Sequence, residues 1–377
     1  MTIPSSYNIV VVGMGHIGKF LLPAYEMLLA EKVSTNVFGV KATDRDIEEQ
    51  RAMVPFQVSV NNTAELLREK NPDIVIMCPP PKQIPVVAKE ILLPYFNEAR
   101  QKGISLPDIY SFGPSPDPQF YYDLLGPDIR CVKFLPSMAQ SYQDVPLHKI
   151  GGSFLCFVPN HNFPKDRFDR AVNVSDLFGQ TFIVSHQDSL VGLTGKNTAR
   201  TCFEISFAVS DAMVELGYNI TTSQIGSAMR VFFREHLNIE GDGLCRSSID
   251  EIPEIFRPFI KKLTIAWFEG IHRYIISTGC DPELGKKFHI ANFETWLLTI
   301  QLATREELVV LTGKQATKGG VNEKAIETFM NYFDMQLRKS VNLCMDKTLP
   351  ESFFDTAEGM AYTINLTVNR HSHRLAG

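Results

Sequence analysis

Short apolar runs recur along the first half of the chain, and each is bounded by turn-forming residues. This pattern favours buried strands at residues 7–12, 36–42, 57–60, 73–78, 108–112, 129–134, 152–158 and 181–184. Segments with helical spacing separate some of these runs, at 63–70 and 86–102. Strands that alternate with helices predict a mostly parallel, doubly wound sheet, because right-handed crossovers place helices on both of its faces.

The apolar residues change to helical spacing in the second half of the chain. One helix is expected to end at Gly217 and a second at Gly279, since glycine is a common stop signal. A third helix of roughly six turns is expected from Ile326 to Cys344. The pattern therefore predicts that the second half is helical.

Together the two patterns predict an α/β fold with two domains. A doubly wound sheet of the Rossmann type is expected over 1–188, and an all-α domain over 189–377. The stretch near 219–265 contains Gly- and Pro-bearing loop signals and is expected to form an insertion.

The first apolar run leads directly into a Gly-x-Gly-x-x-Gly turn. The motif consists of Gly13, Met14, Gly15, His16, Ile17 and Gly18. In a strand-turn-helix unit the first glycine permits the turn, the second admits the pyrophosphate of a dinucleotide, and the third lets the helix pack closely on the sheet. A glycine-rich turn without any ligand is the alternative. The framing by a strand favours a nucleotide site.

Further candidate cofactor residues follow later strands. Asp44 and Arg45 come after the second strand, where an acidic residue suits the ribose of NAD and a basic one suits the extra phosphate of NADP. Because both types are present, the choice between NAD and NADP stays open. Cys78, Pro79 and Pro80 follow the strand at 73–78, at the edge of the sheet where ligands of open parallel sheets bind.

The composition argues against several partners and locations. The net charge of −5, without a run of Lys or Arg, gives no footprint for nucleic acid or an anionic membrane. No leader or apolar span is apparent, so a cytoplasmic protein is expected. The seven cysteines are scattered, which is typical of reduced, buried thiols and predicts no metal site.

Four stretches, in order, resemble pyrroline-5-carboxylate reductase, a member of the 6-phosphogluconate-dehydrogenase-like superfamily. They lie at 13–18, 109–137, 192–200 and 316–324. The second resembles the family's strand that ends in Met-Pro-Asn, the third its Ser-Gly-Ser-Gly-Pro-Ala-Tyr helix entry, and the fourth its Ser-Pro-Gly-Gly-Thr-Thr loop. The resemblance spans about three hundred residues, and the segment 219–265 has no counterpart in it.

The resemblance implies hydride transfer between NAD(P)H and a C=N carbon of a small carboxylated metabolite, in a pocket built from the last two motifs. It implies a homodimer as well, which long apolar helices after residue 260 also favour. The candidate catalytic residues are Thr194, Lys196 and Asn322. The candidate substrate-binding residues are Arg200, Thr317, Gly319, Gly320 and Val321. Pro136 and Asn62 join the cofactor-binding candidates, although Asn62 suits a helix cap equally well.

Several positions depart from the family's motifs. Asn322 stands where the family has the second threonine of its loop. Lys196 and Arg200 stand where the family has small, aromatic or proline residues, and their spacing of four places both on one helix face, where they could clamp an added anionic group. An ion pair between Arg200 and Glu204 is an equally good interpretation.

Two other functions remain open. In a 3-hydroxyacid or 6-phosphogluconate-like dehydrogenase, Lys196 would be the general acid. Such relatives have asparagine four residues after that lysine, and here Arg200 occupies the place. A non-catalytic, nucleotide-binding scaffold protein that kept the fold is the second alternative.

Overall fold

The computed structural model describes residues 6–14, 34–54, 56–112, 116–135, 152–158, 161, 163–176, 179–184, 200–240, 249–315 and 320–376. The chain divides into two compact units. The first runs from Met1 to Gln187 and the second from Asp188 to Leu375. An N-terminal sheet flanked by helices is followed by an all-helical unit, as the sequence predicts.

The first unit contains one eight-stranded sheet in the order β3-β2-β1-β4-β5-β6-β7-β8. The strands are β1 Ser6–Val12, β2 Ser34–Lys41, β3 Gln57–Val60, β4 Ile74–Met77, β5 Asp108–Ser111, β6 Arg130–Leu135, β7 Gly152–Phe157 and β8 Gln180–Val184. The first six are parallel, β7 runs antiparallel to β6, and β8 runs parallel to β7. The prediction of a mostly parallel, doubly wound sheet is therefore confirmed.

Both faces of the sheet are buried, which explains why its strands read as continuous apolar runs. Ile9 and Val11 point into one core with residues of α9, and Val10 and Val12 point into the other with residues of α4 to α7. The helices of this unit are α3 Ile47–Met53, α4 Thr63–Lys70, α5 Ile84–Val87, α6 Leu93–Gln101, α7 Pro118–Leu125 and α9 Lys165–Asp176.

The helix expected at 86–102 is continuous but not uniform. A π-helical turn, Ala88–Leu92, joins α5 to α6. Pro94 lies just after this turn, where it lacks an N–H group and its ring would crowd the carbonyl of Glu90. The wider π turn relieves that crowding, since it shifts the backbone hydrogen bonds of the preceding residues.

A buried ion cluster attaches α9 to the sheet. The Asp108 side chain has no exposed surface, and its Oδ1 accepts a hydrogen bond of 2.6 Å from Arg167 Nη1. Its other oxygen accepts one from Arg170. Both carboxylate oxygens are therefore paired, which is the arrangement that a buried carboxylate requires.

The second unit is helical throughout its described residues, as predicted. Its helices are α12 Cys202–Glu215, α13 Thr222–Leu237, α14 Arg257–Ser277, α15 Pro282–Leu302, α16 Arg305–Gln315, α17 Val321–Tyr332, α18 Asp334–Met345 and α19 Ser352–Ala376. Gly217 and Gly279 follow α12 and α14 with positive φ angles, so both predicted stop signals are confirmed.

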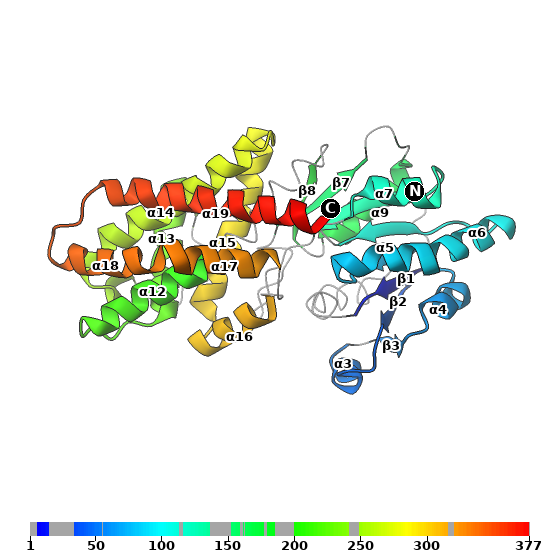
Figure 1. The fold of residues 1–377 in the computed structure, drawn as a ribbon, viewed down its shortest axis with the longest axis horizontal. Coiled ribbons are helices and arrows are strands. Elements are labelled where there is room, and N and C mark those ends of the chain that lie inside the picture. Colours follow the sequence, from blue (N-terminus) through cyan, green and yellow to red (C-terminus); the bar gives the residue numbers. More distant parts are fainter. Residues whose placement is uncertain are drawn as a thin grey trace. The chain divides into compact units, whose positions relative to one another are not determined.

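The single long helix expected from Ile326 to Cys344 is wrong. Phe333, with φ −129° and ψ −33°, separates α17 from α18, which follow one another in Figure 1. Its ring is buried and stacks on Trp267 at 5.4 Å and on Phe353 at 5.9 Å. The apolar residues continue on one face from α17 into α18. The sequence pattern therefore predicts the buried face correctly, whereas tertiary packing determines where the helix is interrupted.

The stretch expected to be an insertion belongs to the core of the helical unit. Within 219–265 lie all of α13 and the start of α14, and α13 buries Ile225, Met229 and Phe233. The loop signals fall between these two helices, where 249–256 form two short 3-10 turns and 241–248 lie outside the described residues.

A buried histidine lies between α14 and α15. His289 is 1% exposed, its Nε2 lies 3.0 Å from the Phe268 carbonyl oxygen, and its ring stacks on the Phe268 ring at 4.4 Å. Burial lowers the pKa of His289 to about 3. The imidazole is therefore neutral in the folded protein at ordinary pH.

We expect this histidine to make the protein sensitive to acid. In the unfolded chain this histidine has an ordinary pKa near 6.5 and takes up a proton below that pH, whereas in the folded protein it stays neutral down to about pH 3. The free energy of unfolding therefore keeps the full contribution of His289 above pH 6.5 and loses it as the pH falls toward 3. The loss from this group should be about 2 kcal/mol between pH 7 and pH 5. His289→Phe, which keeps a stacked ring, should remove that part of the slope in urea unfolding. Equal slopes for the two proteins would contradict the prediction.

Candidate functional site

The order of the strands creates a reversal point between β1 and β4. From β1 the chain proceeds to β2 and β3 on one side, and from β4 to β5 and β6 on the other. In open parallel sheets the crossovers part at such a point and leave a crevice at the carboxyl ends of the two strands, where ligands bind. Gly13 follows β1 and Cys78 follows β4, so the reversal brings two groups of predicted site residues together.

Gly13 lies directly against the segment that follows β4. Its φ is +92°, and a Cβ built there would lie 2.6 Å from the Pro79 nitrogen and 2.7 Å from the Cys78 carbonyl carbon. Only glycine fits both the dihedral angle and the space. The first glycine of the motif thus allows the tight turn that the sequence predicts.

The backbone of this turn is tied to β2. The N–H groups of Gly13 and Met14 both donate to the Val40 carbonyl, at 3.0 and 2.9 Å. The Met14 side chain is fully buried and packs against Gly39, so it belongs to the core and has no surface for a nucleotide. Gly15, His16, Ile17 and Gly18 lie outside the described residues.

The residues after β4 are mostly buried. Cys78 is 7% exposed, and burial raises the pKa of its thiol, which is therefore unreactive at neutral pH. Pro79 is buried and Pro80 is exposed at the edge of the sheet. Pro136, expected at the corresponding edge after β6, lies outside the described residues.

A basic residue ends β2, at the position where an acid would bind the ribose of NAD. Lys41 pairs with Val60 of β3, and its Nζ donates to the Arg45 carbonyl oxygen. Arg45 extends into solvent with 87% of its side chain exposed, and its Nε lies 3.6 Å from Asp46 Oδ2. Asp44 is exposed as well. This loop therefore presents two cations and two carboxylates after β2, where dinucleotide-binding folds hold the ribose.

Asn62 lies beside this loop but does not cap its helix. Asn62 precedes α4, yet its side chain makes no capping hydrogen bond, so the interpretation as a helix cap is wrong. Its Oδ1 is buried and has no hydrogen-bond partner among the residues that the structure describes. The neighbouring Asn61 N–H donates to the Lys41 carbonyl at 2.8 Å, which ties the exits of β2 and β3 together.

In the helical unit Arg200 is buried at the start of α12. It is 2% exposed, and its Nη2 lies 3.1 Å from Glu204 Oε1, so the expected ion pair is present. Burial raises the pKa of Glu204, although the charge of Arg200 acts in the opposite direction. Thr194 and Lys196 lie outside the described residues.

The last motif leads into α17. Gly320 precedes α17 with an extended backbone (φ −87°, ψ 172°), and Val321 and Asn322 are half-buried in its first turn. Thr317 and Gly319 lie outside the described residues. Trp267 contacts both α12 and α17, since its Nε1 donates to Thr201 just before α12 and its ring meets that of Phe329 on α17.

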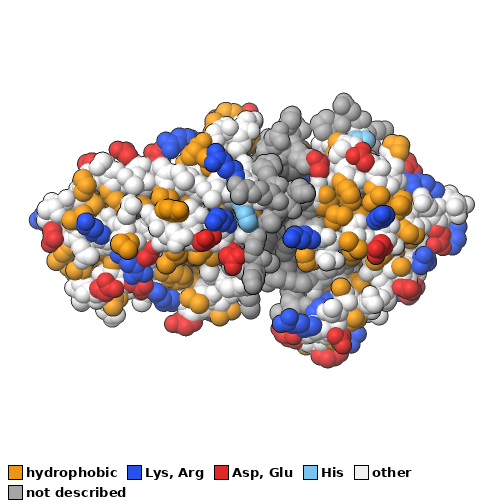
Figure 2. Space-filling view, in the orientation of Figure 1, with side chains coloured by type: hydrophobic (Ala, Val, Ile, Leu, Met, Phe, Trp, Pro, Cys, Tyr) orange, Lys and Arg blue, Asp and Glu red, His pale blue; other side chains and the backbone are white. Residues whose placement is uncertain are grey.

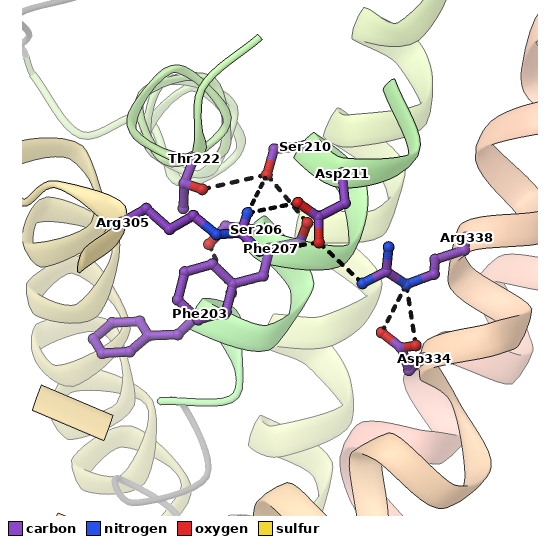
Figure 3. Close-up of polar contacts among 9 residues, drawn as sticks. All are labelled: Phe203, Ser206, Phe207, Ser210, Asp211, Thr222, Arg305, Asp334 and Arg338. Carbon is purple, nitrogen blue, oxygen red and sulfur yellow. Dashed lines mark hydrogen bonds and ion pairs between the residues drawn. The ribbon is translucent and has the colours of Figure 1, made fainter. Parts of the chain in front are cut away.

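The structure also contains a polar network that sequence reasoning missed (Figure 3). Asp211 on α12 accepts two hydrogen bonds from Arg305, at 2.6 and 3.0 Å, and one of 3.1 Å from Arg338. Burial alone would raise the pKa of Asp211, but these hydrogen bonds lower it. The network joins α12, α16 and α18. Only the i,i+4 spacing of Asp334 and Arg338 is visible in the sequence.

The surface gives no further candidate on the face drawn in Figure 2. There, Lys and Arg side chains alternate with Asp and Glu over the coloured parts of both units. Within the described ranges no group of His, Cys, Asp and Glu is placed to hold a metal ion. The described helices also include none with the length and apolar character to cross a membrane.

Comparison with known proteins gives only distant likenesses. No family model matches the sequence, and no curated protein matches it significantly. Among solved structures, the Plasmodium falciparum pyrroline carboxylate reductase with NADP bound is 11% identical, with a TM-score of 0.38 over 95% of this chain and 100% of that one. The Coxiella burnetii pyrroline-5-carboxylate reductase is 15% identical, with a TM-score of 0.41 over 97% and 98% of the two chains. D-mandelate dehydrogenase with NADH is 9% identical, with a TM-score of 0.41 over 95% and 98%. Sequence identities and TM-scores this low carry no argument about function, so the fold is assigned from the strand order of the sheet.

Proposed function

We propose that the protein is an NAD(P)-dependent oxidoreductase that reduces a C=N bond of a small carboxylated metabolite. One observation supports this most. The first six strands follow the order of dinucleotide-binding sheets, and the glycine turn after β1 lies at the point where that order reverses. The choice of a C=N bond rests on the sequence resemblance to pyrroline-5-carboxylate reductase.

The described residues of the first unit suit a dinucleotide. The unpartnered Asn62 Oδ1 is an acceptor of the kind that ribose hydroxyls would satisfy, and it lies beside the loop after β2. A bound nicotinamide would supply the hydride, so the chain's own task is to bind and orient. In the second unit Arg200 and the start of α17 are proposed to hold the substrate.

The experiment is NAD(P)H oxidation with pyrroline-5-carboxylate and related cyclic imines, followed by fluorescence. Turnover on an imine would support the proposal. Nucleotide binding without turnover on any imine or keto acid would favour the scaffold alternative, and turnover on hydroxyacids alone would favour a dehydrogenase related to 6-phosphogluconate dehydrogenase. Absence of binding to every pyridine nucleotide would overturn all three.

We further propose that the cofactor is NADP. Lys41 occupies the end of β2, and the Arg45 side chain is 87% exposed, with its Nε 3.6 Å from Asp46 Oδ2. A 2′-phosphate favours such cations, whereas Asp44 would repel it.

Arg45→Ala should therefore weaken NADPH binding by about tenfold to 100-fold, the range expected for lost hydrogen bonds to a charged group. NADH binding should change little, and the fold should be unaffected because the side chain is exposed. Titration of nucleotide fluorescence measures both affinities. Asp44→Ala is the opposing control: if it selectively weakens NADH binding, and Arg45→Ala does nothing, NAD is the cofactor.

A further inference from the structure

The ion pair at the start of α12 is buried but incompletely bonded. Arg200 is 2% exposed and Glu204 is 6% exposed. A single hydrogen bond of 3.1 Å joins them, from Arg200 Nη2 to Glu204 Oε1. Arg200 Nε, Arg200 Nη1 and Glu204 Oε2 are all buried and have no hydrogen-bond partner among the described residues. A buried polar group without a hydrogen-bond partner destabilises a fold, and more so when the group is charged.

Other carboxylates in this chain are bonded more completely. Both oxygens of Asp108 accept hydrogen bonds from arginines, and both oxygens of Asp211 do the same. Among the described residues, the pair of Arg200 and Glu204 therefore has two donor groups and one acceptor oxygen without partners. Such a set is what a bound molecule with complementary groups would satisfy.

The surroundings of the pair favour an anion with an apolar body. The guanidinium carbon of Arg200 lies 5.9 Å from the Phe203 ring, which in turn meets the Trp296 ring edge-on. Trp267 donates to the Thr201 hydroxyl at 3.1 Å. The pair also lies at the N-terminal end of α12, a helix of 14 residues whose dipole favours negative charge there.

We propose that the start of α12 is a proton-linked binding site for a carboxylate, in which Arg200 donates to the carboxylate and Glu204 takes up one proton on binding. The proposal rests on the proposed function only in treating the helical unit as the substrate-binding unit. It also goes beyond the resemblance, because the matching helix entry has no arginine at this position.

Charge balance explains the proton. Arg200 with an ionised Glu204 is neutral, so a bound carboxylate would leave one uncompensated negative charge in a buried place, which is costly. Protonation of Glu204 removes that charge and turns Oε2 into a donor toward the ligand. Within the described part of the chain, Glu204 is influenced electrostatically by Arg200, and the buried Cys202 thiol is the other titratable group beside it. Sulfate, which has two negative charges, would not be neutralised by one proton.

The test is calorimetric titration of the nucleotide-free, full-length protein with cyclopentanecarboxylate. Cyclopentanecarboxamide is the uncharged analogue, and sulfate is the doubly charged anion. We expect the carboxylate to bind at least about tenfold more tightly than either one, because the carboxamide lacks the charge that strengthens hydrogen bonds to Arg200 and the doubly charged anion would keep an uncompensated buried charge. Its affinity should fall as pH rises from 6 to 8.5, by up to about tenfold per pH unit, since proton release from Glu204 competes with binding.

Two variants test whether Arg200 and Glu204 cause the carboxylate binding and its pH dependence. Arg200→Met should weaken carboxylate binding by at least about 100-fold, the loss expected for two charge-assisted bonds. Glu204→Gln, which is permanently neutral and similar in shape, should retain the binding and lose its pH dependence. Arg338→Met is the matched control, because Arg338 also contacts α12, through Asp211, at a different point.

The outcomes separate clearly. Equal affinity for carboxylate and carboxamide in the wild-type protein would mean that buried water satisfies these atoms, and would overturn the proposal even if Arg200→Met failed to fold. Unchanged pH dependence in Glu204→Gln would overturn the proton linkage. Because no nucleotide is present, neither result depends on whether the protein is an oxidoreductase.

Discussion

Gly13→Ala is expected to destabilise the protein by more than about 3 kcal/mol, the sum of a disallowed backbone angle and an overpacked contact. The added Cβ would lie 2.6 Å from the Pro79 nitrogen and 2.9 Å from its Cα, and both atoms belong to backbone that cannot rotate away. Urea unfolding measures the loss. Any molecules that remain folded should bind NADPH poorly, because the turn must widen at the proposed nucleotide edge.

Gly217 provides the control that distinguishes backbone strain at a positive φ from the steric contact of the added Cβ. Its φ of +89° is nearly that of Gly13, but a Cβ built on Gly217 meets nothing within 4 Å. Gly217→Ala should therefore show the strain alone, about 1–2 kcal/mol. If both substitutions cost the same, the close approach of Gly13 to the segment after β4 is not a constraint on the fold.

Gly270→Ala is expected to cost about 3 kcal/mol, at the upper end of the usual range for overpacking in a core. At this position α14 crosses α19 so closely that a Cβ would fall well inside contact distance of the Glu358 carbonyl oxygen and 2.8 Å from the Ala361 Cβ. The helices must move apart to accommodate it, which would also disturb the neighbouring contact of Tyr274 with Tyr362. Chemical unfolding followed by near-ultraviolet circular dichroism measures both effects.

Gly359 gives a matched control on α19 itself. A Cβ there meets nothing within 4 Å, so Gly359→Ala should stabilise the protein by about 0.5–1 kcal/mol, because alanine loses less conformational freedom than glycine in a helix. The two substitutions are chemically identical and should differ in sign. Equal effects would mean that α14 and α19 are not in contact at Gly270.

Local patterns predicted much of the first unit. The strands at 57–60 and 108–112 match β3 and β5 within one residue, and the helix at 63–70 matches α4. β5 is buried along its whole length, α4 is buried on one stripe, and β3 buries Val58 beside more exposed neighbours, so the spacing of apolar residues predicts each of them. The helices α3, α7 and α9 were missed, because short amphipathic segments between strands have too few apolar positions to show a period.

Side-chain partners were less predictable than elements. The Arg200–Glu204 pair was one of two interpretations that the spacing allowed, and its incomplete bonding depends on how the surrounding helices bury it. Asn62 had the sequence context of a helix cap, yet its backbone dihedral angles of −127° and 32° accompany no capping bond. Asp211 gains its partners from residues 94 and 127 positions later in the chain, and no local sequence pattern can predict contacts at such separations.

The sequence by itself determined the change from a strand period to a helical period, the glycine turn after the first strand and the helix stops at Gly217 and Gly279, since these depend on backbone preferences of neighbouring residues. Only the tertiary structure decided that β1 and β4 are adjacent, that Phe333 divides an apolar helix in two, and that Arg200 is buried with N–H groups that no described residue accepts. The physical reason is distance along the chain. Propensity and periodicity act over a few residues, whereas strand order, helix crossings and the burial of charge are fixed by contacts between segments that the sequence keeps far apart.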